Sequence, residues 1–171
     1  MKKVFGIVGW SGSGKTDLTT RIIKLFVEMN IIVSSLKHSH HDFEIDKKGK
    51  DSYEHLKSGS NEVVIYNEYK FAMITKKKRK KITLKDIVKK FSLDTDIILI
   101  EGLKKGPNKK IEVYRDSIKK PLLCHRDKNI KALIFDKITP KISQISLPKF
   151  HIDETKKIGS FILKEIKNEK Q

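Results

Sequence analysis

The sequence has little cysteine, few aromatic residues and no long apolar run, and each shortage excludes a class of protein. Cys124 is the only cysteine, so no internal disulfide can form and a reducing, cytoplasmic setting is expected. No apolar run approaches the roughly 20 residues of a membrane span, so no membrane partner is expected. Aromatic residues are only 8% of the chain, but 37% is hydrophobic, which is enough for a folded core.

Acidic residues are scarce as well: 21 stand against 38 basic residues, a formal net charge of +17. This sign favours anionic ligands, among them nucleotides, nucleic acids and acidic protein surfaces. The excess is mostly lysine spread along the chain, and residues 76–81 are its only dense block. No RNA-binding aromatic motif, zinc-finger spacing or basic heptad pattern accompanies that block. We therefore expect a solvated connection there and do not expect nucleic acid as the main partner.

Residues 9–16 match the phosphate-binding loop pattern G-x-x-x-x-G-K-[ST] in full. The loop reads Gly9, Trp10, Ser11, Gly12, Ser13, Gly14, Lys15 and Thr16. An apolar run at 4–8 precedes it, and Leu18, Ile22, Leu25, Phe26 and Met29 follow it at helical spacing. Between a strand and a helix, the backbone N–H groups of such a loop can bind phosphate oxygens. Lys15 can reach the outer phosphates as a catalytic residue, and the Thr16 hydroxyl can bind Mg²⁺.

Strand-like and helix-like segments alternate along the chain, which predicts one α/β domain over residues 1–171. We expect a P-loop NTPase fold with three αβα layers around a mostly parallel sheet. The expected strands are 4–8, 31–36, 62–66, 70–75, 96–101, 110–114 and 131–135, and the expected later helices are 51–57, 83–91 and 153–167. The strands at 62–66 and 70–75 are too close for a crossover helix, so they are expected to add an antiparallel hairpin that makes the sheet mixed. The strand at 110–114 alternates as if half-exposed, and 138–148 is expected to be irregular.

An acidic residue follows the most apolar strand. Residues 96–100 are nearly all aliphatic, and Glu101 and Gly102 come directly after them. Ligands of parallel α/β sheets bind beyond the carboxyl ends of the strands, so Glu101 is expected near the phosphate loop. A carboxylate there can hold Mg²⁺ together with Thr16. The sequence therefore predicts a metal site made by Thr16 and Glu101.

The segment 37–46 carries three histidines and three acidic residues. One interpretation is a zinc site, although zinc ligands are usually held on rigid elements and structural sites favour cysteine. Another is a switch-like segment that closes over the γ-phosphate, with Asp42 or Asp46 contacting Mg²⁺ or orienting water. A third is a polar loop without a specific role. Asp42 is our candidate for a catalytic contact.

Several motifs together give the chain a family resemblance. They are the phosphate loop 9–16, the histidine-rich segment 37–46, residues 49–53, the strand end 101–104, and the stretches 107–115 and 147–153. In this combination the sequence resembles the molybdopterin-guanine dinucleotide biosynthesis adaptor family, the MobB proteins. The phosphate loop alone is shared by many NTPases, whereas the histidine-rich segment makes the match discriminating.

The resemblance implies a GTP-binding accessory protein with weak GTPase activity that uses GTP and Mg²⁺. Its implied partner is the molybdenum cofactor guanylyltransferase, which joins GMP to molybdopterin, and molybdopterin itself is a candidate ligand. The resemblance also implies a homodimer, for which the strands at 62–75 or 109–114 offer edges. Asp136 is a candidate to face the base, but the guanine-reading motif Asn-Lys-x-Asp is missing, so guanine specificity depends on the resemblance alone.

Two further functions share the phosphate loop and stay open at this point. A small-molecule kinase would need an arginine-bearing lid and a second substrate pocket. A metallochaperone GTPase of the nickel-insertion kind would use the histidines as metal ligands.

Overall fold

The computed structural model describes residues 3–39, 42–76 and 81–168. The chain divides into two compact units, which are described here one at a time. The first unit combines residues 1–38 with 91–171, and the second consists of residues 39–90. The expectation of one domain over the whole chain stays a prediction.

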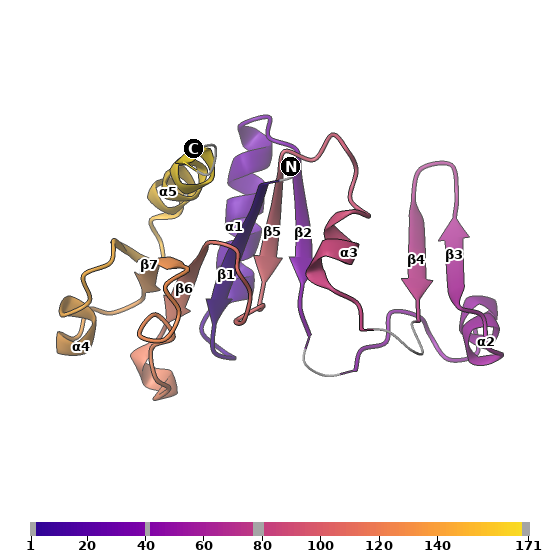
Figure 1. The fold of residues 1–171 in the computed structure, drawn as a ribbon, viewed down its shortest axis with the longest axis horizontal. Helices are drawn as coiled ribbons and strands as arrows, with labels where there is room; N and C mark the ends of the chain where they lie inside the picture. The colour runs from indigo at the N-terminus through magenta and orange to yellow at the C-terminus, as the bar shows by residue number, and fades with distance from the viewer. Residues whose placement is uncertain (1–2, 40–41, 77–80, 169–171) are drawn as a thin grey trace. The chain divides into compact units, whose positions relative to one another are not determined.

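The first unit is built on a six-stranded sheet in the order β2-β5-β1-β6-β7-β8, in which every neighbouring pair is parallel (Figure 1). The strands are β1 (Lys3–Gly9), β2 (Val33–Lys37), β5 (Ile97–Glu101), β6 (Lys110–Tyr114), β7 (Ile130–Phe135) and β8 (Lys149–His151). Because all six run the same way, their carboxyl ends meet at one edge. The phosphate loop follows β1 at that edge, as the sequence predicts.

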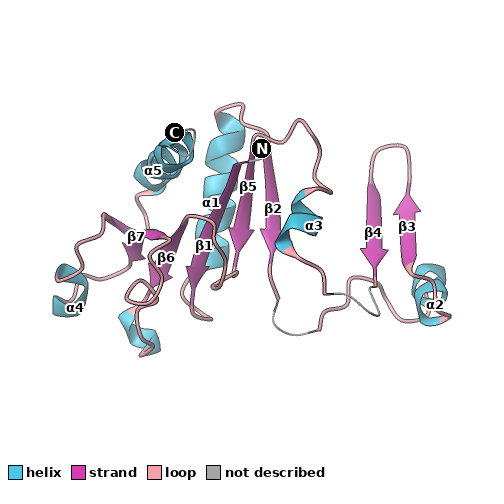
Figure 2. Ribbon diagram, viewed as in Figure 1, coloured by secondary structure: helices cyan, strands magenta, loops and turns pink. Residues whose placement is uncertain are grey.

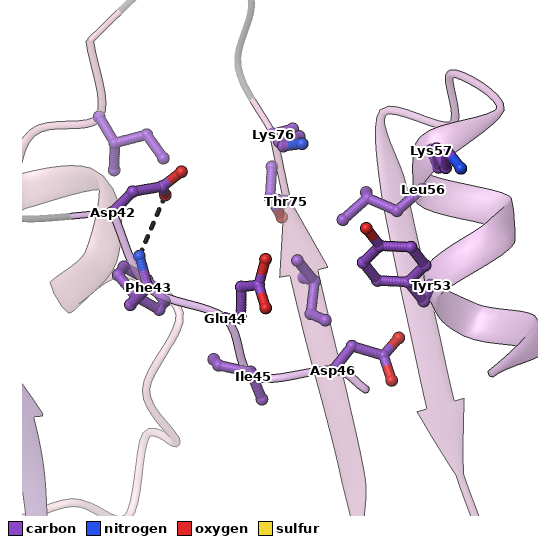
Figure 3. A pocket seen from close by; sticks show the side chains of 12 residues that line it. Asp42, Phe43, Glu44, Ile45, Asp46, Tyr53, Leu56, Lys57, Thr75 and Lys76 are labelled. Carbon is purple, nitrogen blue, oxygen red and sulfur yellow. Dashed lines mark hydrogen bonds between the residues drawn. The ribbon is translucent and has the colours of Figure 1, made fainter. Parts of the chain in front are cut away.

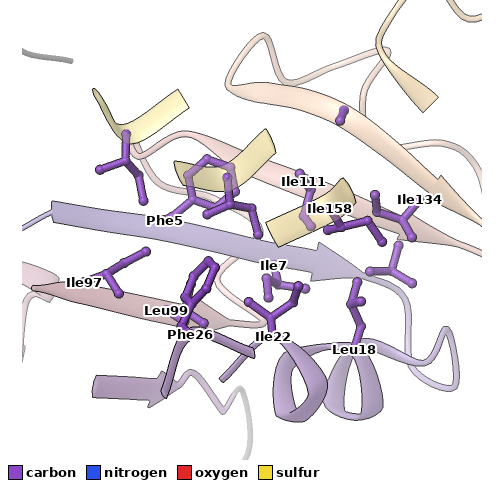
Figure 4. Close-up of a cluster of buried hydrophobic side chains, with 14 of the residues drawn as sticks. Phe5, Ile7, Leu18, Ile22, Phe26, Ile97, Leu99, Ile111, Ile134 and Ile158 are labelled. Carbon is purple, nitrogen blue, oxygen red and sulfur yellow. The ribbon is translucent and has the colours of Figure 1, made fainter. Parts of the chain in front are cut away.

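Two helices, α1 (Lys15–Glu28) and α5 (Thr155–Lys167), pack against each other and against β1 on one face of the sheet (Figure 2). Their inward residues recur at helical spacing, and Leu18, Ile22 and Phe26 of α1 are fully buried. These side chains meet alternate residues of the strands, such as Phe5, Ile7 and Leu99 (Figure 4). The helix ends at Glu28, and Met29, the last residue of the predicted repeat, is its C-cap and is half exposed.

The opposite face of the sheet carries a second, smaller apolar cluster. Tyr114, Leu122, Leu133 and Ile142 form it, and Ile142 comes from the short helix α4 (Pro140–Ser143). A single 3-10 turn, η1 (Asp116–Ile118), follows β6. The expectation of an irregular segment at 138–148 was therefore wrong in part, since Thr139 caps α4 and accepts a hydrogen bond from the Ile142 N–H. The three-residue strand β8 was also missed.

The expectation that 110–114 is half-exposed was wrong, because all five residues of β6 are buried. Polar and apolar residues do alternate along β6, but both faces of the strand are buried, and its polar side chains form hydrogen bonds within the protein. Lys110 Nζ donates to Gly106 O at 2.8 Å and to Asp127 Oδ2 at 2.9 Å. Glu112 accepts from the N–H groups of Leu123 and Cys124, both at 2.8 Å. Burial raises the pKa of Glu112, and these two hydrogen bonds oppose the shift.

β6 also offers no edge for pairing with another molecule, because β1 and β7 flank it on both sides. This finding corrects the expectation that 109–114 could serve as a dimer edge. The strand predicted at 96–101, the most apolar one, lies inside the sheet as β5 (Ile97–Glu101) between β2 and β1.

The second unit contains α2 (Asp51–Lys57), β3 (Glu62–Tyr66), β4 (Phe71–Thr75) and α3 (Leu84–Val88). β3 and β4 form the expected antiparallel hairpin, and Asn67 shapes its turn by accepting from the N–H groups of Tyr69 and Lys70. The hairpin is a separate two-stranded sheet, so the expectation of one mixed sheet was wrong. Thr83 caps α3 in a capping box with Asp86, although the helix ends at Val88, earlier than the expected Phe91.

Candidate nucleotide-binding site

The phosphate loop turns tightly between β1 and α1. Gly12 and Gly14 have φ of 78° and 93°, a left-handed conformation that side chains disfavour. Gly9 is required for a different reason, since a Cβ there would lie 2.3 Å from Val113 O of the neighbouring strand. The first backbone N–H groups of any helix lack an intrahelical acceptor, and no side chain caps those of α1 at Gly14. The loop therefore presents a concave set of N–H donors to an anion.

Lys15 folds back over this loop. Its Nζ donates to Trp10 O at 2.8 Å, while Thr19 Oγ1 donates to Lys15 O at 2.7 Å. Burial lowers the pKa of Lys15; the charge of Glu101 opposes this shift, and the charges of Lys104 and Lys37 add to it. An anion beside the Lys15 ammonium group would replace Trp10 O as its hydrogen-bond acceptor. Its negative charge would also reduce the repulsion between Lys15 and the neighbouring Lys37 and Lys104.

Thr16 and Glu101 meet across the loop, as the metal-site prediction requires. Thr16 Oγ1 donates to Glu101 Oε1 at 2.8 Å, and Lys37 Nζ lies 3.8 Å from the same carboxylate oxygen. Gly102 then turns the chain away, and its N–H donates to Ile7 O at 3.0 Å. A hydroxyl and a carboxylate at this spacing are oxygen ligands of the kind that Mg²⁺ prefers.

Trp10, the second residue of the phosphate loop, makes contacts that could not be predicted from the sequence. Lys104 Nζ lies 3.8 Å from the centre of the indole ring, and Lys120 Nζ lies 5.9 Å from it. Trp10 Nε1 donates to Pro121 O at 2.7 Å. Two cations over one ring are attracted to its π face. Lys104 belongs to the Glu-Gly-Leu-Lys motif, but no local signal pairs it with Trp10.

Arg115 is the second residue that the sequence did not place. A Cβ on Gly14 would lie 3.2 Å from Arg115 Nη2, so the guanidinium lies directly beside the phosphate loop. Arg115 Nε is 3.9 Å from Asp136 Oδ2. His151 Nε2 is 2.9 Å from Asp136 O. The sequence shows that Arg115 follows one strand and Asp136 follows another. It does not show that the first of these strands, β6, is the neighbour of β1, or that the second, β7, is the neighbour of β6.

The loop residues fit a polyphosphate. Ser13 is 1% exposed, its Oγ lies where it would be 2.6 Å from a Cβ on Gly9, and within the described ranges this hydroxyl has no hydrogen-bond partner. Lys15, Lys37 and Lys104 bring three positive charges to the same edge. The Thr16–Glu101 pair adds two oxygen groups of the kind that could hold a metal beside the phosphates. Of the predicted site residues, loop 9–16 and Glu101 lie together in the first unit, and Asp42 belongs to the second unit.

Asp42 belongs to the second unit, where it lines a cavity of about 410 Å³ with Phe43, Ile45, Tyr53 and Ile74 among others (Figure 3). Its Oδ1 accepts from the Phe43 N–H at 3.0 Å, which is a local turn contact. Asp46 lines the same cavity, and its Oδ1 accepts from the Lys47 N–H at 2.9 Å. The catalytic role of Asp42 stays a prediction.

The histidine-rich segment is described only in part, since His40 and His41 lie outside the described residues. Among the residues that are described, no three His, Cys, Asp or Glu side chains gather as metal ligands. Burial, with the charge of Glu112, raises the pKa of Cys124 to about 11, so its thiol is a poor metal ligand at neutral pH. Within the same ranges, every helix lacks the length or the apolar character that crossing a membrane requires.

Comparison with known proteins gives one consistent answer. The family model described as molybdopterin guanine dinucleotide synthesis protein B, MobB, matches residues 4–136. A molybdopterin-guanine dinucleotide biosynthesis adapter protein of Haemophilus influenzae is 39% identical over 120 residues, 70% of this chain and 67% of that protein. A probable adapter protein of Bacillus subtilis is 28% identical over 166 residues, 95% of this chain and 92% of that protein.

Solved structures agree over nearly the whole length. A crystal structure of molybdopterin-guanine biosynthesis protein B superimposes with a TM-score of 0.72 at 27% identity, covering 94% of this chain and 98% of the other. The crystal structure of Bacillus subtilis MobB gives a TM-score of 0.72 at 26% identity, with 95% and 96% coverage.

Proposed function

This chain belongs to the molybdopterin guanine dinucleotide synthesis protein B family, and we propose that it acts as a GTP-binding adapter when GMP is attached to molybdopterin. The observation that carries the proposal is the glycine loop 9–16. Beside this loop, Thr16 Oγ1 donates a hydrogen bond to Glu101 Oε1 at 2.8 Å. Its N–H groups and Lys15 would hold the phosphates, and Thr16 and Glu101 would hold Mg²⁺. GTP and Mg²⁺ are thus the proposed cofactors. The single thiol, Cys124, supports a reducing cytoplasm as the setting.

We propose slow hydrolysis at most. Fast phosphoryl transfer needs a positioned water and a positive charge at the transition state. The Glu101 carboxylate is already engaged by Thr16 and Lys37, so it is poorly placed to activate water. Mg²⁺, when bound, and Arg115 beside Gly14 would both supply positive charge, so a partner protein would have to provide the group that positions the attacking water. The proposed role is therefore to present the nucleotide rather than to consume it.

The proposed partner is the guanylyltransferase that joins GMP to molybdopterin, and molybdopterin is a second candidate ligand. The formal net charge of +17 favours an acidic partner surface and anionic cofactor phosphates. Lys104 and Lys120 place part of this charge beside the phosphate loop, through their contacts with Trp10. A partner that takes over the nucleotide would bind at this edge of the sheet.

We also propose a homodimer formed through the β3–β4 hairpin. Two-stranded sheets are marginally stable alone, and within the described ranges these strands pair only with each other. Tyr66, Tyr69 and Phe71 are 81%, 91% and 74% exposed, which is unusual for large apolar side chains close together on one hairpin. The corresponding hairpin of a second copy offers the matching apolar surface and strand edge.

The nucleotide role is tested by titrating GTP into the protein with and without Mg²⁺. Lys15→Ala is expected to weaken binding by at least about a hundredfold, because it removes a charge-assisted contact to the phosphates. Lys24→Ala, an exposed position on the same helix, is the control for the lost charge and is expected to bind normally. Glu101→Gln is expected to reduce the gain in affinity that Mg²⁺ gives. Equal GTP affinity in Lys15→Ala and wild type would overturn the proposal.

A further inference from the structure

Asp136 follows β7 at the same edge of the sheet as the phosphate loop, with β6 between β7 and β1. We infer that its carboxylate reads the guanine base of the bound nucleotide. The inference rests on the GTP binding proposed above and deepens it, because it assigns base selectivity to a residue outside the phosphate loop.

The position of the metal pair sets the direction of the nucleotide. Thr16 and Glu101 lie on the β5 side of the loop, and they would hold a metal beside the outer phosphates of a bound nucleotide. The γ-phosphate end would therefore lie toward β5, and the nucleoside would extend in the other direction, toward the ends of β6, β7 and β8. Arg115, Asp136 and His151 come from those three strand ends.

Asp136 is held in a fixed position relative to the loop. Arg115 lies beside Gly14 and reaches 3.9 Å from Asp136 Oδ2, and His151 Nε2 contacts Asp136 O at 2.9 Å. The Ile152 N–H donates to Phe135 O at 2.8 Å, which fixes the backbone just before Asp136. The Arg115 contact is an ion pair longer than a hydrogen bond, so it orients the carboxylate and leaves its lone pairs for a ligand. The Asp136 side chain is 28% exposed, which allows that ligand to reach it.

Nearby polar side chains are already engaged. The chain has Asp136, Lys137, Ile138 and Thr139 in sequence, and Thr139 uses its hydroxyl to cap α4. Asp116 accepts from the Tyr114 hydroxyl at 3.0 Å. Asp153, after β8, pairs through its Oδ2 with His151 Nδ1 at 3.3 Å, whereas the contact of the Asp136 carboxylate with Arg115 is 3.9 Å long and leaves its oxygens able to accept from a base.

The chemistry of a carboxylate selects guanine over adenine. Guanine presents two adjacent donors, its N1–H and its 2-amino group, and the two carboxylate oxygens can accept both. Adenine presents an acceptor at N1, which a carboxylate repels. A site that is built to pair with donor groups rejects a ligand that lacks them far more strongly than an apolar site does.

Asp136→Asn tests the assignment by changing which base fits. Wild type, this variant and the control Asp94→Asn, at the opposite end of the sheet, are titrated with GTP, ATP and xanthosine triphosphate. In Asp136→Asn, GTP affinity is expected to fall at least about tenfold. Xanthosine triphosphate affinity is expected to rise by a similar factor, because the 2-carbonyl of xanthine accepts from the asparagine amide. The control is expected to match wild type.

Three outcomes overturn the inference. An equal loss of affinity for all three nucleotides means that Asp136 only positions Arg115 and the loop. An unchanged preference for GTP, or a wild type that does not distinguish GTP from ATP, excludes base reading at this position. If any of these occurs while Lys15→Ala still weakens nucleotide binding, the phosphate-loop assignment stands and only the role of Asp136 fails.

Discussion

The two compact units bury apolar side chains to very different extents. In the first unit, alternate residues of the strands meet α1 and α5 on one face, and Phe5, Ile22 and Leu99 are fully buried. In residues 39–90, the only buried side chain among those described is Val63, at 8% exposure. A domain becomes stable by removing apolar surface from water, and only the first unit does so with its own residues.

This difference assigns different roles to the two units: the first holds the nucleotide site in place, and the second offers a surface for contact with another chain. The phosphate loop, Thr16 and Glu101 are positioned by a rigid, buried sheet, so their geometry is set before any ligand binds. The hairpin keeps large apolar residues on its surface, which favours association with another chain. We therefore expect changes in the first unit to act on folding and changes in the second to act on assembly.

The largest expected effect is in the core of the first unit. Phe26→Ala is expected to lower the free energy of unfolding by about 3–5 kcal/mol, because it leaves a cavity between α1 and the sheet. Urea unfolding followed by fluorescence of Trp10, the only tryptophan, measures this unit alone. Val27→Ala, at a neighbouring position that is 58% exposed, is the control and is expected to change less than about 0.5 kcal/mol. Similar losses in both variants would contradict the core described here.

An intermediate effect is expected from the buried contact between Lys110 and Asp127. Asp127→Asn is expected to cost about 2 kcal/mol, because it leaves the fully buried Lys110 ammonium without its carboxylate. Burial raises the pKa of Asp127, but hydrogen bonds from Lys110 and Asn129 outweigh this effect, so the pKa lies below its ordinary value. A lowered pKa means that the unfolded state binds more protons, so this contribution is complete above about pH 4 and is lost on further acidification.

The measurement is urea unfolding of wild type and Asp127→Asn at pH 7 and in a series of buffers below pH 4. The difference between the two proteins is expected to shrink as the pH falls through this range. A difference that stays constant down to the most acidic buffer would mean that the carboxylate's charge is not what stabilises β6.

These contrasts also show which features a sequence can reveal. The phosphate loop, α1 and the hairpin were predicted because their signals are local: a fixed motif, a helical repeat and two short strands. Strand order is not local, so the position of Arg115 beside Gly14 of the loop could not be predicted. The strand β6 was misjudged because its alternation of polar and apolar residues is the usual sign of an exposed face. Here Lys110 and Glu112 are buried with their own partners.

Sheet membership was misjudged for a similar reason. The pairing of β3 with β4 follows from the short turn at Asn67, but nothing in the local sequence says whether a hairpin joins a larger sheet. The short elements α4 and β8 were missed because four and three residues give too little periodicity to recognise. The features that could not be predicted are thus those that depend on contacts between distant segments.

The smallest effect on folding, and the sharpest test of the comparison, is expected at the hairpin. Phe71→Ala removes an aromatic ring that is 74% exposed, so Trp10-monitored unfolding is expected to change by less than about 0.5 kcal/mol. The dimer dissociation constant, measured by analytical ultracentrifugation, is expected to rise about tenfold or more, because aromatic residues dominate interface energies. Leu93→Ala, at a position that is 93% exposed in the first unit, is the control and is expected to leave the dimer unchanged. A wild type that stays monomeric at high concentration, or a dimer that tolerates Phe71→Ala, would exclude the hairpin as the contact between copies.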